Sequence, residues 1–209
     1  MIEQIIKNLR KAYPPSFFDR AESPFYVLIS TVLSQRTRDE TTYKIAPKLF
    51  KKYRTPQQFM KADSNNIKKI IKGIGFYNQK TKRIKEISKI LVEKYSGKVP
   101  KTFEELISLP GVGRKTANCV LVYAFRIPAI PTDIHVHRLS NRIGWVKTKT
   151  PEETEAKLIK IIRRKYWIEV NELLVKHGQS ICKPITPICS KCPITKYCAY
   201  FKNKKNKRK

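Results

Sequence analysis

Residues 109–118 read Leu109-Pro110-Gly111-Val112-Gly113-Arg114-Lys115-Thr116-Ala117-Asn118. A helical pattern precedes this segment, and Pro110 ends it because proline cannot continue the hydrogen-bond ladder of a helix. Gly111 and Gly113 allow the backbone to turn tightly, and a second apolar pattern with spacings of three and four residues follows at once. The segment is therefore predicted to be the turn of a helix-hairpin-helix.

This glycine turn is expected to present main-chain N–H groups at the N-terminus of the second helix. Such groups bind anions, and the positive end of the helix dipole adds to the attraction. We therefore predict that the turn binds a DNA phosphate through Gly111, Val112, Gly113 and Arg114. Lys115 is expected one turn inside the second helix, next to the nucleotide that carries the phosphate.

The composition of the chain agrees with a polyanionic partner. Lys and Arg number 45 against 16 Asp and Glu, which gives a net charge of +29. Only six of the positive charges lie in the run 202–209, so most of the charge belongs to the folded part of the chain. A surface of this kind attracts nucleic acid, although a generally lysine-rich protein is the alternative.

Apolar residues recur at helical spacing along most of the chain. About ten helices are predicted, among them 25–33 and 38–52, and no segment shows the alternating pattern of a strand. The predicted fold class is therefore all-α. The sequence contains no secretory leader and no apolar run of about 18 residues, so we expect a cytoplasmic protein, nucleoid-associated if prokaryotic, without a membrane partner.

Four of the five cysteines lie close together near the C-terminus. They are Cys182, Cys189, Cys192 and Cys198, with the spacing C-x6-C-x2-C-x5-C. Clustered cysteines in a chain without a leader favour metal binding over disulfides. Four thiolates suit zinc or a [4Fe–4S] cluster, and the long gaps favour the larger group because they leave room to wrap it. We therefore predict a [4Fe–4S] cluster, with zinc as the alternative.

Three features together resemble the endonuclease III family of DNA repair glycosylases. They are the hairpin 109–115, the motif Thr132-Asp133-Ile134-His135 and the four-cysteine loop. The resemblance implies two helical domains that flank a DNA-binding cleft. A six-helix barrel with the helix-hairpin-helix is expected at 21–131, and a helical domain with the cluster loop at 1–20 and 132–201. A basic, disordered tail is expected at 202–209.

By this resemblance, Lys115 is the nucleophile and Asp133 the essential carboxylate. An amine that attacks the sugar carbon expels the base and forms a Schiff base, after which β-elimination can cut the strand. A free lysine has a pKa of about 10.4, and the helix N-terminus and the positive protein field would favour its neutral form. A carboxylate acts in the opposite sense, so Asp133 is expected to accept a proton or to stabilise the sugar cation. An ordinary helix cap is the alternative role of Asp133.

Further residues are expected to contact the DNA. The resemblance places His135 near the DNA backbone, with core packing as the alternative. A glycosylase must also fill the gap that an extruded base leaves. Arg36 and Phe76 fall where the family commonly has glutamine and leucine, and we predict that they enter the duplex, with Gln35 as a competing candidate. For Phe76, packing in the core is the alternative.

The predicted function is that of a bifunctional DNA glycosylase and AP lyase. The enzyme is expected to act as a monomer on double-stranded DNA with damaged or abasic sites. It would remove oxidised pyrimidines and cut the strand 3′ of the abasic site by β-elimination. A mismatch uracil or thymine glycosylase is the nearest alternative, although such relatives often lack the lysine. The alternative from another class is a non-catalytic iron–sulfur protein that binds DNA.

Overall fold

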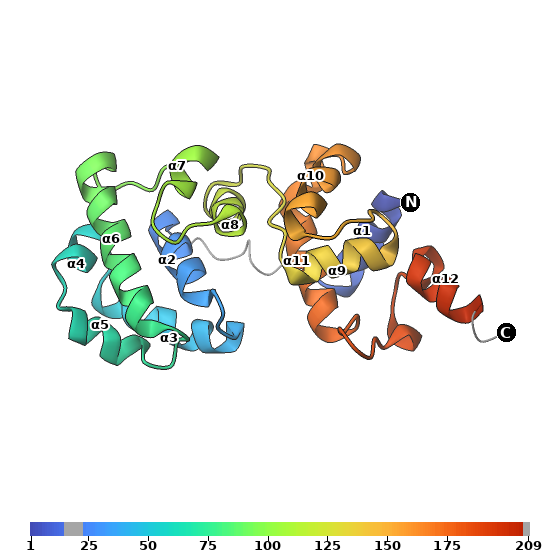
Figure 1. Cartoon of the computed structure of the whole chain (residues 1–209), viewed down its shortest axis with the longest axis horizontal. Helices are drawn as coiled ribbons and strands as arrows, with labels where there is room; N and C mark the ends of the chain where they lie inside the picture. Colours follow the sequence, from blue (N-terminus) through green and yellow to red (C-terminus); the bar gives the residue numbers. More distant parts are fainter. Residues whose placement is uncertain (15–22, 207–209) are drawn as a thin grey trace. The chain divides into compact units, whose positions relative to one another are not determined.

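The computed structural model describes residues 1–14 and 23–206. No strand occurs among these residues, so the predicted all-α class is confirmed. The helices belong to two compact units, Ala21–Arg126 and Met1–Arg20 with Ile127–Lys209; Figure 1 labels the helices of both. Within the described ranges, no helix combines the length and the apolar content that crossing a bilayer requires.

The unit Ala21–Arg126 contains the helices from α2 to α8. These are α2 (Pro24–Ser34), α3 (Asp39–Lys52), α4 (Pro56–Lys61), α5 (Ser64–Ile71), α6 (Tyr77–Tyr95), α7 (Phe103–Ile107) and α8 (Arg114–Phe125). Helix α2 lies at the centre of this unit, since it packs against α3, α6 and α8 and buries most of its apolar side chains. Ser23 begins it by accepting a hydrogen bond from Tyr26 N, and Pro24 occupies the first helical position.

The other unit combines the N-terminal helix with the C-terminal helices. These are α1 (Ile2–Ala12), α9 (Ile134–Ile143), α10 (Pro151–Ile161), α11 (Trp167–Ser180) and α12 (Ala199–Asn206), with short 3-10 turns at Arg164–Tyr166, Cys189–Lys191 and Thr195–Tyr197. The apolar faces of α1, α9 and α11 form one buried cluster. Cys182 and Cys192 pack against that cluster, so the cysteine loop is joined to the core that holds α9.

Helix α12 has no counterpart among the predicted helices. The expectation of a disordered tail is wrong for residues 202–206, which lie in α12, while 207–209 lie outside the described residues. Tertiary contacts explain the difference: Arg142 of α9 lies 5.0 Å from the ring centroid of Tyr200, and Gly144 lies so close to Ala199 that an added Cβ would be 2.9 Å from it. The two units separate between residues 126 and 127, whereas the sequence suggested 131 and 132; the assignment of the domains stays a prediction.

Candidate active site

The predicted hairpin turn lies between the end of α7 and the start of α8. Val112 N donates to Leu109 O at 3.1 Å, and Gly111 has a φ of 74°, a conformation that favours glycine. Gly113 is the N-cap of α8 and offers no side-chain cap to the first turn of that helix. A Cβ added at Gly113 would meet no atom within 4 Å, so the helix N-terminus is open to a ligand on this side.

The residues of this turn divide into buried and exposed ones. Val112 is buried, so only its main chain is available to DNA. Arg114 is exposed, and its guanidinium carbon lies 4.8 Å from the ring centroid of Phe103, which links the two helices of the hairpin. Lys115 is partly exposed and is the second residue of α8, so it lies in the first turn of the helix rather than one turn inside it.

Gln35, a candidate for filling the gap in the DNA, has another contact here. Its Nε2 donates to Gly111 O at 2.8 Å and to Thr116 Oγ1 at 3.1 Å. These two acceptors flank Lys115 in the chain, so the side chain of Gln35 braces the hairpin. Its role in the DNA gap stays a prediction.

Asp133 is the N-cap of α9. Its Oδ1 accepts hydrogen bonds from His135 N and Val136 N, both at 2.9 Å. The capping role that was one alternative is therefore present, and it fixes the carboxylate at the helix start. Lys115 belongs to the unit Ala21–Arg126, and Asp133 belongs to the other unit.

The two histidines after Asp133 make different contacts. The ring Nδ1 of His135 lies 3.2 Å from Arg138 Nη2 and against Gly178 of α11, where an added Cβ would be 2.7 Å away from it. His137 bonds instead to Thr154 Oγ1 at 2.7 Å. They contact different neighbours, because residues two apart on a helix face different directions. His135 thus takes part in packing, and a contact with DNA stays a prediction.

Arg36 and Phe76 lie in two turns of the unit Ala21–Arg126. Both have left-handed backbones, with φ values of 50° and 58°, which are uncommon for residues other than glycine. The guanidinium carbon of Arg36 lies 5.7 Å from the centroid of the Phe76 ring. Phe76 is 56% exposed, so packing in the core is not its role. Strained backbones that present exposed side chains are typical of functional sites.

A third feature of these turns escaped the sequence analysis. Lys80, in the first turn of α6, is only 2% exposed. Its Nζ donates to Leu33 O at 2.7 Å, to Gln35 O and to Thr37 Oγ1 at 3.0 Å. A signal was present in the sequence, since Lys80 precedes the buried Ile84 by four residues and therefore shares its helix face.

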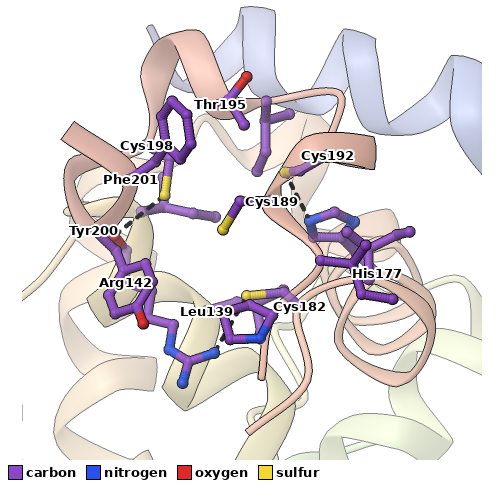
Figure 2. Close-up of a pocket in the computed structure, with 15 residues that line it drawn as sticks. Leu139, Arg142, His177, Cys182, Cys189, Cys192, Thr195, Cys198, Tyr200 and Phe201 are labelled. Atoms are coloured by element: carbon purple, nitrogen blue, oxygen red, sulfur yellow. Dashed lines mark hydrogen bonds between the residues drawn. The ribbon is translucent and has the colours of Figure 1, made fainter. Parts of the chain in front are cut away.

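The four predicted cysteines line one cavity, shown in Figure 2. The cavity has about 380 Å³ of space, counted with the adjoining solvent, and Cys182, Cys189, Cys192 and Cys198 all border it. None of them forms a disulfide. Burial raises the pKa of the Cys192 thiol to about 11 and also raises that of Cys198. These thiols therefore stay protonated unless a cation lies beside them.

Two side chains reach sulfur atoms at the edge of this cavity. Arg142 Nη1 lies 3.5 Å from Cys182 Sγ, and His177 Nε2 lies 3.5 Å from Cys192 Sγ (Figure 2). Burial lowers the pKa of His177 to about 4, so its ring is neutral. Across the described ranges, no three His, Cys, Asp or Glu side chains gather around a point as ligands of one metal ion. The thiols instead surround a space.

The chain is similar in sequence to known base excision repair proteins. A family model described as "HhH-GPD superfamily base excision DNA repair protein" matches residues 29–164. The endonuclease III of Thermotoga maritima is 51% identical over 204 residues, which cover 98% of this chain and 95% of that protein. The endonuclease III of Bacillus subtilis is 35% identical over 199 residues, with 94% and 91% covered.

Solved structures give the same grouping. A trapped covalent intermediate of endonuclease III with DNA has a TM-score of 0.88 at 35% identity and covers 98% of this chain and 97% of that one. A thermostable thymine-DNA glycosylase has a TM-score of 0.84 at 27% identity, with 97% and 95% covered. The resemblance drawn from the hairpin, the Asp133 motif and the cysteine loop is thereby confirmed.

Proposed function

Because the chain belongs to the endonuclease III family of base excision DNA repair enzymes, we propose that Lys115 is the nucleophile and Asp133 the essential carboxylate of its active site. The protein is a DNA N-glycosylase and AP lyase. The observation that supports the assignment most directly is the place of Lys115. It is the second residue of α8, directly after an open turn suited to a DNA phosphate.

The neutral amine of Lys115 would attack the anomeric carbon of the nucleotide. The base leaves with the bonding electrons, and the amine loses one proton to a general base. The ring oxygen then takes up a proton and leaves the anomeric carbon, so that the sugar ring opens to an iminium whose nitrogen keeps the second amine proton. The iminium acidifies the adjacent carbon, and loss of a proton there expels the 3′ phosphate. The N-terminus of α8 carries the partial positive charge of the helix dipole. It therefore disfavours a charged lysine there and favours the neutral amine that this attack requires.

Asp133 would support this attack through its carboxylate. Its Oδ1 is held by the main-chain N–H groups of His135 and Val136, which orient the group. A carboxylate held in this way can accept the proton that Lys115 loses, or stabilise positive charge on the sugar.

DNA would be bound through its backbone and through the gap left by the extruded base. The open N-terminus of α8 would take a phosphate, and the net charge of +29 makes binding strongly salt-dependent. Arg36 and Phe76, which are exposed and lie next to each other, would fill the gap. We further propose that the enzyme acts as a monomer in the cytoplasm.

The cysteine-lined cavity fits a [4Fe–4S] cluster. Four thiols that form no disulfide line one cavity, and four cysteine thiolates are the usual ligand set of such a cluster. Cys182, Cys189, Cys192 and Cys198 would hold the cluster, and Cys182 and Cys192 join it to the core of α1, α9 and α11. A bound cluster would supply the structural centre of this loop. Visible absorption of the purified protein tests this, and a colourless, zinc-loaded protein would contradict it.

The preferred base is proposed to be an oxidised pyrimidine. The likeness to a thymine-DNA glycosylase keeps a mismatch thymine or uracil glycosylase as the second candidate. Single-turnover rates on duplexes with thymine glycol, uracil opposite guanine and thymine opposite guanine distinguish the two. Faster removal of the mismatched bases than of thymine glycol would favour the second candidate.

Borohydride trapping on an abasic-site duplex tests the nucleophile. The wild type is expected to form a covalent adduct, and Lys115→Gln to form none. Lys89→Gln is the matched control, because Lys89 also lies on a helix surface and the substitution removes the same charge. An undiminished adduct with Lys115→Gln would show that another amine reacts. The absence of an adduct with the wild type would favour the non-catalytic DNA-binding protein.

A further inference from the structure

Lys80 is a buried lysine to which the proposed reaction assigns no role. Its Nζ donates hydrogen bonds to Leu33 O, Gln35 O and Thr37 Oγ1. An ammonium group has three protons, so the end of α2 and the turn that follows it use all of them. The main chain of Lys80 also donates to Phe76 O at 3.0 Å. One residue therefore contacts both the turn with Arg36 and the turn with Phe76.

The two turns also contact each other directly. Gly75 N donates to Thr37 Oγ1 at 3.1 Å. A Cβ added at Gly75 would lie 2.8 Å from the main-chain oxygen of Arg36, so the approach of the two backbones requires glycine. Thr37 Oγ1 thus accepts from both Gly75 and Lys80, and it joins the three segments.

Left-handed backbones at Arg36 and Phe76 need such support, because strained conformations persist only where their surroundings enforce them. The acceptors of Lys80 are carbonyl and hydroxyl oxygens rather than carboxylates. Burial, with a smaller contribution from Arg83, lowers the pKa of Lys80 to about 8. The fold therefore holds a charged group where an apolar side chain would be easier to bury.

We propose that Lys80 is a positioning residue that holds the turns 33–37 and 73–77 together, so that Arg36 and Phe76 enter the DNA as one rigid pair. This inference rests on the proposed function. On this proposal, the opening of the duplex depends on Lys80, whereas the attack by Lys115 does not. A paired substrate must be opened before reaction, whereas a lesion in an unpaired bubble is already accessible.

The experiment compares two substrates with three proteins. Thymine glycol is placed opposite adenine in a duplex and, separately, inside a bubble of mismatched bases, and the single-turnover rate of base removal is measured. For Lys80→Met, the rate on the duplex is expected to fall by about 10- to 100-fold, as it does when a substrate-contacting group is slightly misplaced. The rate on the bubble is expected to fall by less than about threefold. Lys85→Met is the matched control. Lys85 lies on the same helix and also donates to a main-chain oxygen, that of Ala62, away from both turns.

Equal losses on duplex and bubble, or no loss on the duplex, would overturn the role of Lys80. If Lys80→Met does not fold, Thr37→Val is tested in its place, and its loss on the duplex is again compared with its loss on the bubble. This variant removes the oxygen shared by Lys80 and Gly75 and keeps the side-chain shape. A wild type that removes the base from neither substrate would instead overturn the proposed function. The two failures are thereby distinguishable.

Discussion

The side-chain amide of Gln35 donates a hydrogen bond of 2.8 Å to the main-chain oxygen of Gly111. The same nitrogen donates to Thr116 Oγ1 at 3.1 Å. A side chain at the end of α2 thus holds the hairpin turn on both sides of Lys115. The position of the proposed nucleophile therefore depends on a residue about 80 positions away in the chain.

Replacing Gln35 by Leu is expected to destabilise the protein by about 1 kcal/mol, since it removes both donors while keeping the side-chain volume. Single-turnover cleavage of an abasic-site duplex should fall by about tenfold or more, because the hairpin loses its brace. Gln4→Leu, which removes an exposed hydrogen bond to Asn8, is the control. If Gln35→Leu keeps its stability and loses only opposite-base preference, Gln35 acts in the DNA gap instead.

Asp133→Asn separates the two roles of this residue. Asparagine can accept the same bonds from His135 N and Val136 N, so stability should change by less than about 0.5 kcal/mol. Base removal and strand cleavage should fall by about 100-fold or more, because the charge is lost. Asp63→Asn is a matched control, since Asp63 Oδ1 caps α5 with bonds of 2.9 and 3.0 Å. Wild-type activity of Asp133→Asn would leave capping as its only role.

The two glycines of the hairpin should respond differently to alanine. Gly111→Ala is expected to cost about 1 kcal/mol or more of unfolding free energy, because φ is 74° and the added Cβ would lie 2.7 Å from Arg83 Cδ. Gly113→Ala should cost less, about 0.5 kcal/mol, since its φ of −91° suits alanine and the space around it is open.

The Gly113→Ala variant also tests where the phosphate binds. Gly113→Ala should weaken binding to an undamaged duplex several-fold in fluorescence anisotropy, because the methyl group would occupy the approach to the start of α8. Unchanged affinity of Gly113→Ala, measured at the same salt concentration, would argue against a phosphate at this position.

Lys80 should impose a pH dependence on stability. Its folded-state pKa is lowered to about 8 from an ordinary value of 10.5, so the unfolded chain holds more protons between these values. The contribution of Lys80 to stability is therefore expected to rise as the pH increases through this window. Denaturation of the wild type and Lys80→Met at several pH values measures the difference. A difference that stays constant or falls from pH 8 to 10.5 would contradict it.

Local signals in the sequence predicted much of this protein. The hairpin follows from Pro110, Gly111 and Gly113, because each restricts or frees the backbone at its own position. Asp133 before an apolar pattern predicted a helix start, which the structure contains. The spacing of the cysteines predicted one shared site, and all four line one cavity.

Contacts between distant segments could not be predicted in the same way. The basic run from residue 202 has a composition typical of a disordered tail, yet contacts with α9 accompany a helix there. Gln35 was predicted as a candidate for filling the DNA gap, which stays a prediction, and nothing in the sequence indicated that its amide contacts the hairpin. Lys80 was overlooked because a lysine is usually solvated, and only the packing of α6 against the end of α2 buries it.

The sequence by itself therefore determined the all-α class, the open glycine turn before Lys115 and the four-thiol loop, because these depend on residues that are near neighbours in the chain. The tertiary structure decided which side chains support them. Gln35 bracing the hairpin, Lys80 joining the turns with Arg36 and Phe76, and α12 covering the end of α9 all depend on hydrogen bonds and packing between segments far apart in the sequence. Such contacts arise only when the hydrophobic cores bring those segments together.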